Sequence, residues 1–437
     1  MQVYLTTPDK KCLLARQSDI VWAKERPGVP GITVEPKVRL QTFLGVGAAL
    51  TDSSAWLLMK CMPDAKREAT LRALFTAQQG AGFNVLRICI GASDFNVSGD
   101  YTYCDYADPD LRLFSIHRER AYLIPLLKEI QRLQPRLILM ATPWSPPAWM
   151  KTGKSLHGGH LDPAHYATYA TYLTKYVQAM AEEGLRLDYI TPQNEPAHET
   201  SNYPSMGMTA TEQARFIGGH LGPAFASAKI NTKILCWDHN WDKIDFPLQV
   251  LADPLAARYT AGSAFHAYAG DVSAQGKVQA AFPDKEIHFT ESSGGLWAKD
   301  FGGNIRWDLT NLLLGSVRYG SRSVLKWNLL LDENSGPQNG GCDNCRGVVT
   351  LDRRSGETIL NEEFYAFAHV GRFVLPGSHV IKSSVIEGVP NAVWLRQDGT
   401  RILVCCSEKE AHIQVIEGSR AAQVVIPKGS AVTVTWR

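Results

Sequence analysis

Two glutamates in this chain each follow an apolar, strand-like run. One is Glu195, near the end of residues 187–196, and the other is Glu291, within residues 286–294. Burying a carboxyl group at a strand end is costly unless another group compensates its charge. Two such carboxyls that converge at one mouth of a barrel can together cleave a glycosidic bond. The pair predicts a glycosidase, although either glutamate alone would more simply cap a helix or form an ion pair.

The surroundings of the two carboxyls suggest which one is the nucleophile and which one is the acid/base. A retaining glycosidase holds its carboxyl groups about 5–5.5 Å apart, one as the nucleophile and one as the acid/base. The amide of Asn194, which precedes Glu195, would bind the sugar 2-hydroxyl, so Glu195 is the predicted acid/base and needs a raised pKa. Glu291 is then the nucleophile and must stay ionised. Arg87 would supply the stabilising charge, unless it forms a purely structural ion pair.

Three tryptophans, Trp144, Trp149 and Trp327, lie at or just beyond predicted strand ends. Sugar rings present apolar C–H faces that pack on aromatic planes, and the indole N–H can donate a hydrogen bond. A single tryptophan is more often a core residue. Trp144, however, lies in the turn-rich run Pro-Trp-Ser-Pro-Pro, which does not suit a core strand, so we expect it to contact a sugar.

Other polar residues follow the predicted second and sixth strands. Asp94 could accept hydrogen bonds from sugar hydroxyls, with an Asx-turn or a helix cap as the alternative. Tyr268 could donate a hydrogen bond to the nucleophile. His266, two residues earlier, is either part of the site or a core histidine whose hydrogen bonds are satisfied.

Apolar runs and amphipathic stretches alternate from about residue 43 onward. The predicted strands span residues 43–49, 84–91, 137–144, 187–193, 233–238, 263–268, 286–290 and 324–330. The predicted helices span residues 64–78, 116–134, 163–183, 211–227, 246–251, 272–281 and 304–320. The alternation predicts an α/β fold, a (β/α)8 TIM barrel, whose chemistry gathers at the carboxyl ends of the strands. A doubly wound sheet is the rival, but residues 45–50 hold only a fragment of its Gly-rich phosphate loop.

The pattern changes after about residue 374, where short alternating segments are separated by Gly, Pro, Asn and Asp. They span residues 380–386, 392–397, 401–406, 412–416, 422–426 and 431–436, which is typical of a β-sandwich. Strand-like pieces at residues 3–6 and 31–34 could join it. We therefore expect N-terminal strands of the sandwich in residues 1–40, the barrel in 41–373 and the C-terminal β-sandwich in 374–437.

Composition limits the other classes of function. Hydrophobic residues make up 45% and charged residues 20% of the 437 residues, as in ordinary globular proteins. A net charge of +2 and the lack of a basic aromatic patch argue against nucleic acid as a partner. No apolar run is long enough for a transmembrane segment. The N-terminus does not resemble a signal peptide, so the protein is expected to be cytoplasmic, or secreted or periplasmic if a leader has been removed.

Nine cysteines are an odd number, so at least one thiol is unpaired within the chain. Cys342 and Cys345 lie in a Gly-rich loop and could form a local disulfide in an oxidising compartment. Free thiols and a metal site are the alternatives. A metal site would need two further ligands, and the chain has no second CxxC motif.

Several motifs, in the same order along the chain, resemble glycoside hydrolase family 30. They are Pro-Trp-Ser-Pro-Pro-Ala-Trp-Met-Lys at 143–151, Thr-Pro-Gln-Asn-Glu-Pro at 191–196, Phe-Thr-Glu-Ser at 289–292 and Lys-Trp-Asn-Leu at 326–329. The likeness covers essentially the whole chain. It is greatest to the glucosylceramidase and β-1,6-glucanase branches, in their bacterial form.

The resemblance implies a retaining β-glycosidase, a (β/α)8 barrel with a side β-domain, and no metal or organic cofactor. It implies that Glu195 is the acid/base and Glu291 the nucleophile. The residues implied to grip the reacting sugar are Asp94, Trp144, Asn194 and Trp327, and those in supporting positions are Arg87, Tyr203, His266 and Tyr268. The Asp94 and Trp144 matches favour glucose over the xylose of the xylanase branches.

The sequence departs from the lysosomal-type glucosylceramidase at two places, so the identity of the leaving group is undecided. Ala267 stands where that enzyme has a tryptophan between its histidine and tyrosine, and the loop at 334–345 is similar to that of bacterial members. A β-1,6-glucan, a small β-glucoside, glucosylceramide and a β-xyloside are all candidate substrates.

Two other functions use the same barrel. A non-catalytic carbohydrate-binding protein would be expected to lack one of the two glutamates, and both are present. A lysine-dependent aldolase would use Lys326 to form a Schiff base. The favoured reading is a monomeric glycosidase whose only partner is its carbohydrate substrate.

Overall fold

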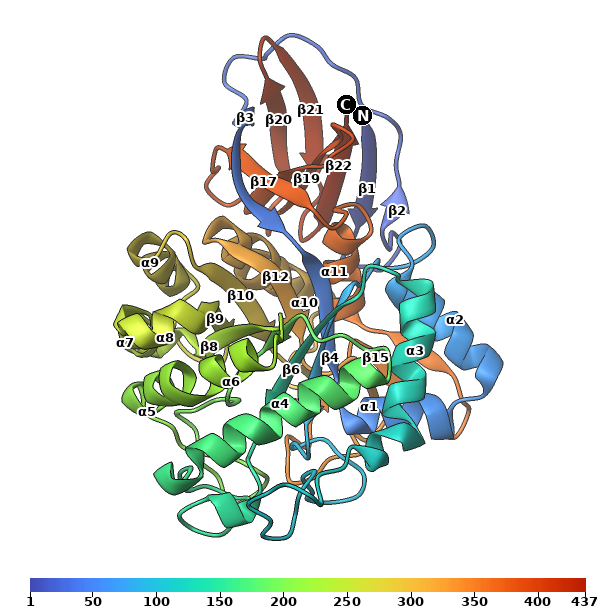
Figure 1. The fold of residues 1–437 in the computed structure, drawn as a ribbon. Coiled ribbons are helices and arrows are strands. Elements are labelled where there is room, and N and C mark those ends of the chain that lie inside the picture. The colour runs from blue at the N-terminus through green and yellow to red at the C-terminus, as the bar shows by residue number, and fades with distance from the viewer.

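The computed structural model describes all 437 residues and contains a closed barrel of eight strands (Figure 1). Neighbouring strands pair in parallel around the ring in the order β10, β12, β4, β5, β6, β7, β8 and β9. Their bounds are β4 (Gly45–Leu50), β5 (Val85–Ile90), β6 (Ile138–Pro143), β7 (Tyr189–Ile190), β8 (Lys233–Asn240), β9 (Thr260–His266), β10 (Glu286–Glu291) and β12 (Ser321–Lys326). The predicted (β/α)8 barrel is confirmed.

Helices surround the barrel, and 3-10 and π-helical segments extend several of them. The α-helices are α1 (Asp52–Trp56), α2 (Asp64–Phe75), α3 (Leu123–Leu133), α4 (Tyr166–Glu182), α5 (Ala210–Phe216), α6 (Gly222–Ser227), α7 (Asp245–Ala252), α8 (Pro254–Tyr259), α9 (Ser273–Ala281), α10 (Phe301–Trp307) and α11 (Glu362–Gly371). The 3-10 turns are η2 (His117–Ala121), η3 (Ala148–Met150), η4 (Pro163–His165) and η6 (Trp241–Lys243), and the π-helical turns are η1 (Leu57–Cys61), η5 (Ile217–Leu221) and η7 (Asp308–Ser316). None of these helices combines the length and apolar character needed to cross a membrane.

Four predicted helices are composite in the structure. Those expected at 116–134 and 163–183 begin with the 3-10 turns η2 and η4, and the other two contain π-helical segments. The helix expected at 211–227 is α5, η5 and α6 in succession, and the one expected at 304–320 contains η7 after α10. The first begins one residue earlier than predicted because Thr209 and Glu212 form a reciprocal capping box. Gly218 lies in its π-helical turn, where a Cβ would come within 2.7 Å of the backbone of Ala256 in α8. Close packing of α8 therefore requires a glycine there.

The fourth barrel strand is shorter than predicted. Residues 187–193 were expected to form it, but β7 covers only Tyr189–Ile190. Pro192 has no N–H to donate to a strand ladder. The segment still follows β6, since the N–H groups of Thr191 and Asn194 donate to the carbonyls of Ala141 and Pro143 at 3.1 and 2.8 Å. Glu195 consequently lies on an irregular extension of the strand.

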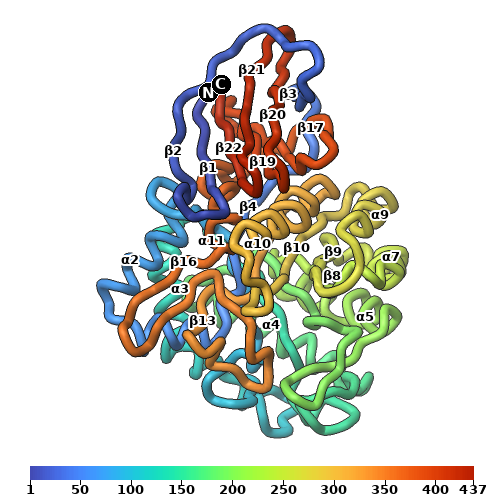
Figure 2. Tube along the Cα trace, turned by 180° about the vertical axis from the view of Figure 1, so that it is seen from behind, coloured from blue at the N-terminus to red at the C-terminus, as the bar shows by residue number.

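Both ends of the chain contribute to a separate β-domain that lies above the barrel in Figure 1. Its strands pair in the order β2, β1, β22, β19, β18, β17, β3, β20 and β21, and β1 lies directly beside β22 (Figure 2). Their bounds are β1 (Gln2–Thr6), β2 (Ala15–Arg16), β3 (Gly31–Phe43), β17 (Ser378–Ser383), β18 (Asn391–Leu395), β19 (Arg401–Cys406), β20 (Ala411–Glu417), β21 (Arg420–Ile426) and β22 (Ala431–Trp436). The β-rich domain predicted from both chain ends is present.

The long strand β3 connects the two layers of this domain. It pairs with β20 at its start and with β17 farther along. Apolar residues of β20 and β21, such as Val415 and Val424, share one core with residues of β19 and β22, such as Leu403 and Val434. The two layers thus enclose a core between them, as in a β-sandwich.

Two small sheets lie among the loops. Strands β11 (Gly294–Gly295) and β14 (Cys345–Arg346) pair antiparallel, and β13 (Leu330–Asp332), β15 (Val349–Leu351) and β16 (Thr358–Leu360) form the other sheet. None of these strands was predicted, because segments of two or three residues carry too little periodicity to be recognised. The β11–β14 pair joins the loop after β10 to the loop after β12.

The outer face of the β-domain packs against the barrel. Trp394 and Val404 on this face belong to the same hydrophobic core as the barrel helices. Between the two domains, the buried His369 of α11 donates from Nδ1 to the Thr433 hydroxyl and accepts from the Thr6 hydroxyl, each at 2.8 Å. Burial lowers the pKa of His369 to about 3, so the imidazole is neutral. It therefore bridges the first and last strands without placing a charge in the interface.

The substitution Thr433→Val should destabilise the protein by about 1–3 kcal/mol, because it leaves the Nδ1–H of the buried His369 without an acceptor. Urea unfolding would measure the loss. Thr435→Val is the matched control, since Thr435 is on the same strand but makes no side-chain hydrogen bond. Equal stability of the two variants would show that the His369 bridge contributes nothing.

Candidate active site

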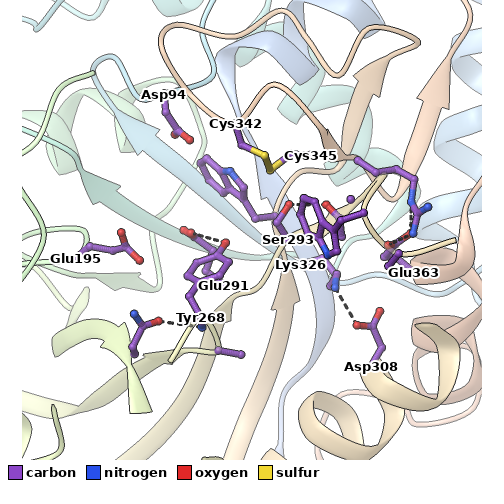
Figure 3. A pocket seen from close by; sticks show the side chains of 18 of the residues that line it. Asp94, Glu195, Tyr268, Glu291, Ser293, Asp308, Lys326, Cys342, Cys345 and Glu363 are labelled. Carbon is purple, nitrogen blue, oxygen red and sulfur yellow. Dashed lines mark hydrogen bonds and ion pairs between the residues drawn. A yellow bond between two sulfur atoms is a disulfide. The ribbon is translucent and has the colours of Figure 1, made fainter. Parts of the chain in front are cut away.

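A cavity of about 810 Å³ opens at the carboxyl ends of the barrel strands. Most of the predicted site residues lie on its wall, namely Asp94, Trp144, Asn194, Glu195, Tyr203, Tyr268, Glu291 and Trp327. The other two, Arg87 and His266, are buried behind that wall and contact the glutamates. Figure 3 shows Glu195 and Glu291 facing the same space, with Tyr268 beside Glu291. The structure thus brings these ten residues together.

The two glutamates approach one another closely. A carboxylate oxygen of Glu195, one of Glu291 and a ring nitrogen of His266 all lie within 4.8 Å of one another. This spacing matches the short separation of retaining glycosidases and leaves no room for the water that an inverting enzyme places between its carboxyls.

Glu291 is held by two donors. Arg87 Nη1 donates to Oε2 at 2.5 Å, and the Tyr268 hydroxyl donates to Oε1 at 3.0 Å. Burial raises the pKa of Glu291, and the nearby His266 and Arg87 cations oppose that rise. The carboxylate therefore has a permanent cation in direct contact.

Glu195 has His266 as its main partner. His266 Nδ1 lies 3.0 Å from Glu195 Oε1, and His266 Nε2 lies 3.0 Å from Asp238 Oδ1. Burial disfavours a charged imidazole, but Glu291, Asp238 and Glu195 outweigh it and raise the pKa of His266 to about 9. Burial also favours protonation of Glu195, yet the His266 hydrogen bond and charge lower the pKa of that carboxyl. The sequence instead predicts a raised pKa for Glu195 and a readily ionised Glu291, so both pKa shifts differ from the prediction.

The location of one proton explains why the pKa of Glu195 is lowered although an acid/base must supply a proton. A carboxylate can only accept hydrogen bonds, so His266 Nε2 must donate to Asp238. The second proton of the imidazolium then lies between His266 Nδ1 and Glu195 Oε1. The pair holds this proton at neutral pH, stored on the imidazole, one hydrogen bond away from the Glu195 carboxyl.

Asp238 is the residue that sequence reasoning missed. It is fully buried and accepts from Arg87 at 2.9 Å and from His266 at 3.0 Å. Three threonine hydroxyls from or just beyond other barrel strands also donate to it, those of Thr142, Thr191 and Thr290. Burial raises its pKa, but Arg87 and His266 outweigh that effect and hold the pKa well below the ordinary value. Its position at the end of the fifth barrel strand was the available signal.

Strained backbone orients the side chains of Asp238 and Glu195. In β8, Trp237 and His239 pair with the consecutive residues Ala264 and Phe265, so Asp238 is the extra residue of a β-bulge. Trp237 and Asp238 have positive φ angles of 72° and 63°. Glu195 also has a positive φ, 46°, and its N–H donates to the carbonyl of Asp238 at 3.0 Å. Such conformations are costly for residues with a Cβ and concentrate at functional sites.

The bulge also brings His239 to the cavity, another residue not singled out beforehand. Its Nε2 lies 3.6 Å from Glu195 Oε1, and its buried Nδ1 has no partner in the protein. Burial lowers the pKa of His239 to about 4, so this imidazole is neutral beside the carboxyl.

Aromatic rings form one wall of the cavity. The Trp144 and Trp327 rings stack with centroids 5.1 Å apart, and the Arg87 guanidinium lies 5.1 Å from the Trp144 ring. Trp149, by contrast, does not line the cavity. Its indole donates to the carbonyl of Cys104 at 2.9 Å, so it stabilises a loop.

Of the acidic residues at strand ends, Asp94 faces the cavity and Asp52 does not. Asp94 Oδ1 is buried without a hydrogen-bond partner in the protein, and burial together with Glu291 raises the pKa of this carboxyl. Asp52 accepts hydrogen bonds from Tyr122 and from the N–H of Val97 and is absent from the cavity wall. Asp94 is therefore the acid whose free oxygen is available to a ligand.

The Cys342–Cys345 loop forms part of the cavity wall and packs against Asp94. The two cysteines form a disulfide, which is the first of the three alternatives (Figure 3). The Asn339 N–H donates to the carbonyl of Asp94 at 2.7 Å, and a Cβ on Gly341 would lie 2.7 Å from the same oxygen. A glycine at 341 is thus required for the loop to pack so closely.

The site is poorly suited to a metal ion. Glu195, His266 and Glu291 have the right ligand atoms near one another. His266, however, holds protons on both nitrogens and Arg87 already neutralises Glu291, and metal ligands must be deprotonated. Lys326, the aldolase alternative, forms an ion pair with Asp308 at 2.9 Å. A Schiff-base lysine must present its amine to a carbonyl carbon, whereas this amine is held by Asp308.

Comparison with known proteins identifies the family. The model of the glycosyl hydrolase family 30 TIM-barrel domain matches residues 43–374. Endo-1,6-beta-D-glucanase of Neurospora crassa is 31% identical over 99% of this chain and 90% of its own length. The lysosomal acid glucosylceramidase of Mus musculus is 28% identical over 93% of this chain and 82% of its own. The solved structure of the endo-beta1,6-glucanase BT3312 matches with a TM-score of 0.92 and 33% identity, covering 100% of this chain and 99% of that one. The resemblance read from the motifs is thus confirmed, and the chain belongs to glycosyl hydrolase family 30.

Proposed function

We propose that this glycoside hydrolase cleaves β-1,6-linked glucan with retention of anomeric configuration, using Glu291 as the nucleophile and Glu195 as the acid/base. The observation that carries the proposal is the approach of the two carboxylates to within 4.8 Å at one cavity. Only a double displacement uses two carboxyls that close together.

The first chemical step joins Glu291 to the sugar. One Glu291 oxygen forms a bond to the anomeric carbon while the bond from that carbon to the leaving oxygen breaks. The leaving oxygen takes a proton from Glu195, which draws on the proton shared with His266. In the second step a water attacks the anomeric carbon, gives a proton back to Glu195, and the bond to Glu291 breaks.

The contacts of each glutamate support this division of roles. Glu291 accepts from Arg87 and Tyr268, which favour the ionised form that a nucleophile needs. Glu195 instead contacts His266, whose stored proton suits an acid/base. Asn194 accepts from Arg87 through Oδ1 at 2.6 Å, so its amide nitrogen is available to a sugar hydroxyl.

The remaining cavity residues suit a glucose ring. The Trp144 and Trp327 rings offer apolar surface to sugar C–H groups. The partnerless oxygen of Asp94 offers an acceptor to sugar hydroxyls. Tyr203, which contacts His198 at 3.1 Å, adds a hydroxyl on the same wall.

The relatives favour glucan as the substrate. The two relatives named as endo-1,6-β-glucanases are 31% and 33% identical to this chain, and the named glucosylceramidase is 28% identical. Glucosylceramide is the second candidate because that relative also covers 93% of the chain. We further propose that the enzyme acts as a monomer in an oxidising compartment, such as the periplasm or the cell exterior. The Cys342–Cys345 disulfide supports that location, and one chain supplies the entire cavity wall.

The purified protein should hydrolyse a β-1,6-gluco-oligosaccharide with a higher kcat/KM than an aryl β-xyloside, which lacks the C6 hydroxymethyl group, or glucosylceramide. Proton NMR should show the β-anomer as the first product. A preference for glucosylceramide would overturn the proposed substrate, and an α-anomer would overturn the retaining mechanism.

Glu291→Gln should reduce kcat by 10⁴-fold or more (about 5.5 kcal/mol of transition-state stabilisation) because the amide cannot form the glycosyl bond. A 2-fluoro-β-glucoside should label Glu291 of the parent protein, as peptide mass spectrometry would detect. Glu357→Gln, at an exposed glutamate, is the control. Labelling of another residue, or turnover by Glu291→Gln, would show that the nucleophile is elsewhere.

The pH dependence of kcat/KM should be bell-shaped. The Glu195–His266 pair must hold its proton, so activity should fall as pH rises through about 9, where the pKa of His266 lies. Glu291 must be ionised, and burial raises the pKa of that carboxyl, so the acidic limb should lie above about 4.3, the ordinary glutamate value. His266→Gln should move the alkaline limb to lower pH, because Glu195 then titrates alone. An unmoved alkaline limb would contradict the shared proton.

A further inference from the structure

The catalytic cavity has a second end that the proposed mechanism does not use. Beyond Glu291 it continues between the loop after β10, helix α10 and the loop after β12. The residues that line this second end are Gly294, Gly295, Trp297, Gly303, Asn304, Trp307, Asp308, Lys326, Arg346 and Glu363. In Figure 3, Lys326, Asp308 and Glu363 lie across Glu291 from Glu195. The barrel order agrees, since β12 and β7 are on opposite sides of the ring.

Two ion pairs form the deep wall of this end. Lys326 Nζ lies 2.9 Å from Asp308 Oδ1, and both side chains are buried. Arg346 Nη2 lies 2.8 Å from Glu363 Oε1. The cluster contains as many acidic as basic groups among these four residues, so it favours neither an anion nor a cation. It offers many hydrogen-bond donors and acceptors to a neutral polar molecule.

Two exposed tryptophans form the outer part. Trp297 is 56% exposed and Trp307 is 44% exposed, although both are large apolar side chains. The Trp297 ring lies against Gly295, where a Cβ would come within 1.8 Å of a ring atom. Gly295 is in turn fixed by its pairing with Cys345. The glycine therefore leaves room for the indole to pack against β11 at the mouth of the cavity.

The exposed tryptophans and the two ion pairs of this second end suit a sugar better than a lipid. Pyranose rings have apolar faces that pack on indole planes and hydroxyls that pair with charged groups. An acyl chain beside the Lys326–Asp308 and Arg346–Glu363 pairs would remove their hydration without replacing any hydrogen bond. We propose that the second end binds the glucosyl residue next to the reacting one in a glucan chain, with Trp297 and Trp307 as its platforms. This inference rests on the proposed glucanase function.

Trp297→Ala tests the proposal through substrate length. The ratio of kcat/KM for a β-1,6-linked glucotetraose to that for an aryl β-glucoside should fall about tenfold, which corresponds to 1.4 kcal/mol. Trp297→Phe should recover most of the ratio because it retains an aromatic face. Tyr106→Ala, which removes an exposed aromatic side chain outside the cavity, is the matched control. An unchanged ratio in Trp297→Ala would overturn the proposal.

Gly295→Ala gives a second test that leaves the tryptophan in place. The added Cβ must displace the Trp297 ring, so the ratio should fall as it does in Trp297→Ala. Calorimetric titration of the full-length Glu291→Gln variant with glucotetraose measures binding without turnover, and adding Trp297→Ala should weaken it about tenfold. Equal binding would contradict the subsite. If the parent protein hydrolyses neither substrate, the glucanase function itself fails, whereas hydrolysis with an insensitive ratio refutes only the subsite.

Discussion

The active site depends on one buried cation. Arg87 is 1% exposed, and the cost of removing its charge from water is offset by Asp238 and Glu291. Because the guanidinium is planar, its nitrogens also fix the Asn194 amide relative to both carboxylates. A single side chain therefore positions Glu291, Asn194 and Asp238, which lie on or just beyond β10, β7 and β8.

The meeting of the two glutamates could be predicted from sequence because each lies at or near a strand end. In a (β/α)8 barrel every such end faces one mouth, so residues nearly a hundred positions apart can be predicted to meet. Glu195 and Glu291 do meet, and so do Asp94, Trp144 and Tyr268. The sharing of one proton between Glu195 and His266 could not be predicted from sequence, since it depends on the contacts of His266 with Asp238 and Glu195.

Other features escaped prediction for local reasons. Asp238 enters the barrel through a β-bulge, and an extra residue in a strand changes the alternation on which sequence patterns rely. The second end of the cavity combines residues from several loops, such as Trp297, Lys326 and Arg346. Loop residues have no periodicity that would predict their meeting. Trp149 shows the same limit, because the sequence left open whether this tryptophan faces the site or packs in a loop, and its contact with Cys104 decides for the loop.

The pairing of β1 with β22 affects how the protein folds. Val3 and Val434 are direct neighbours in the sheet, although more than 400 residues separate them along the chain. Bringing such distant segments together is slow. Until then an unpaired edge remains available to other chains, and a barrel that is already formed would still lack its cover. The small β-domain, and not the barrel, therefore contains the strand pairing that must form across the greater separation in sequence.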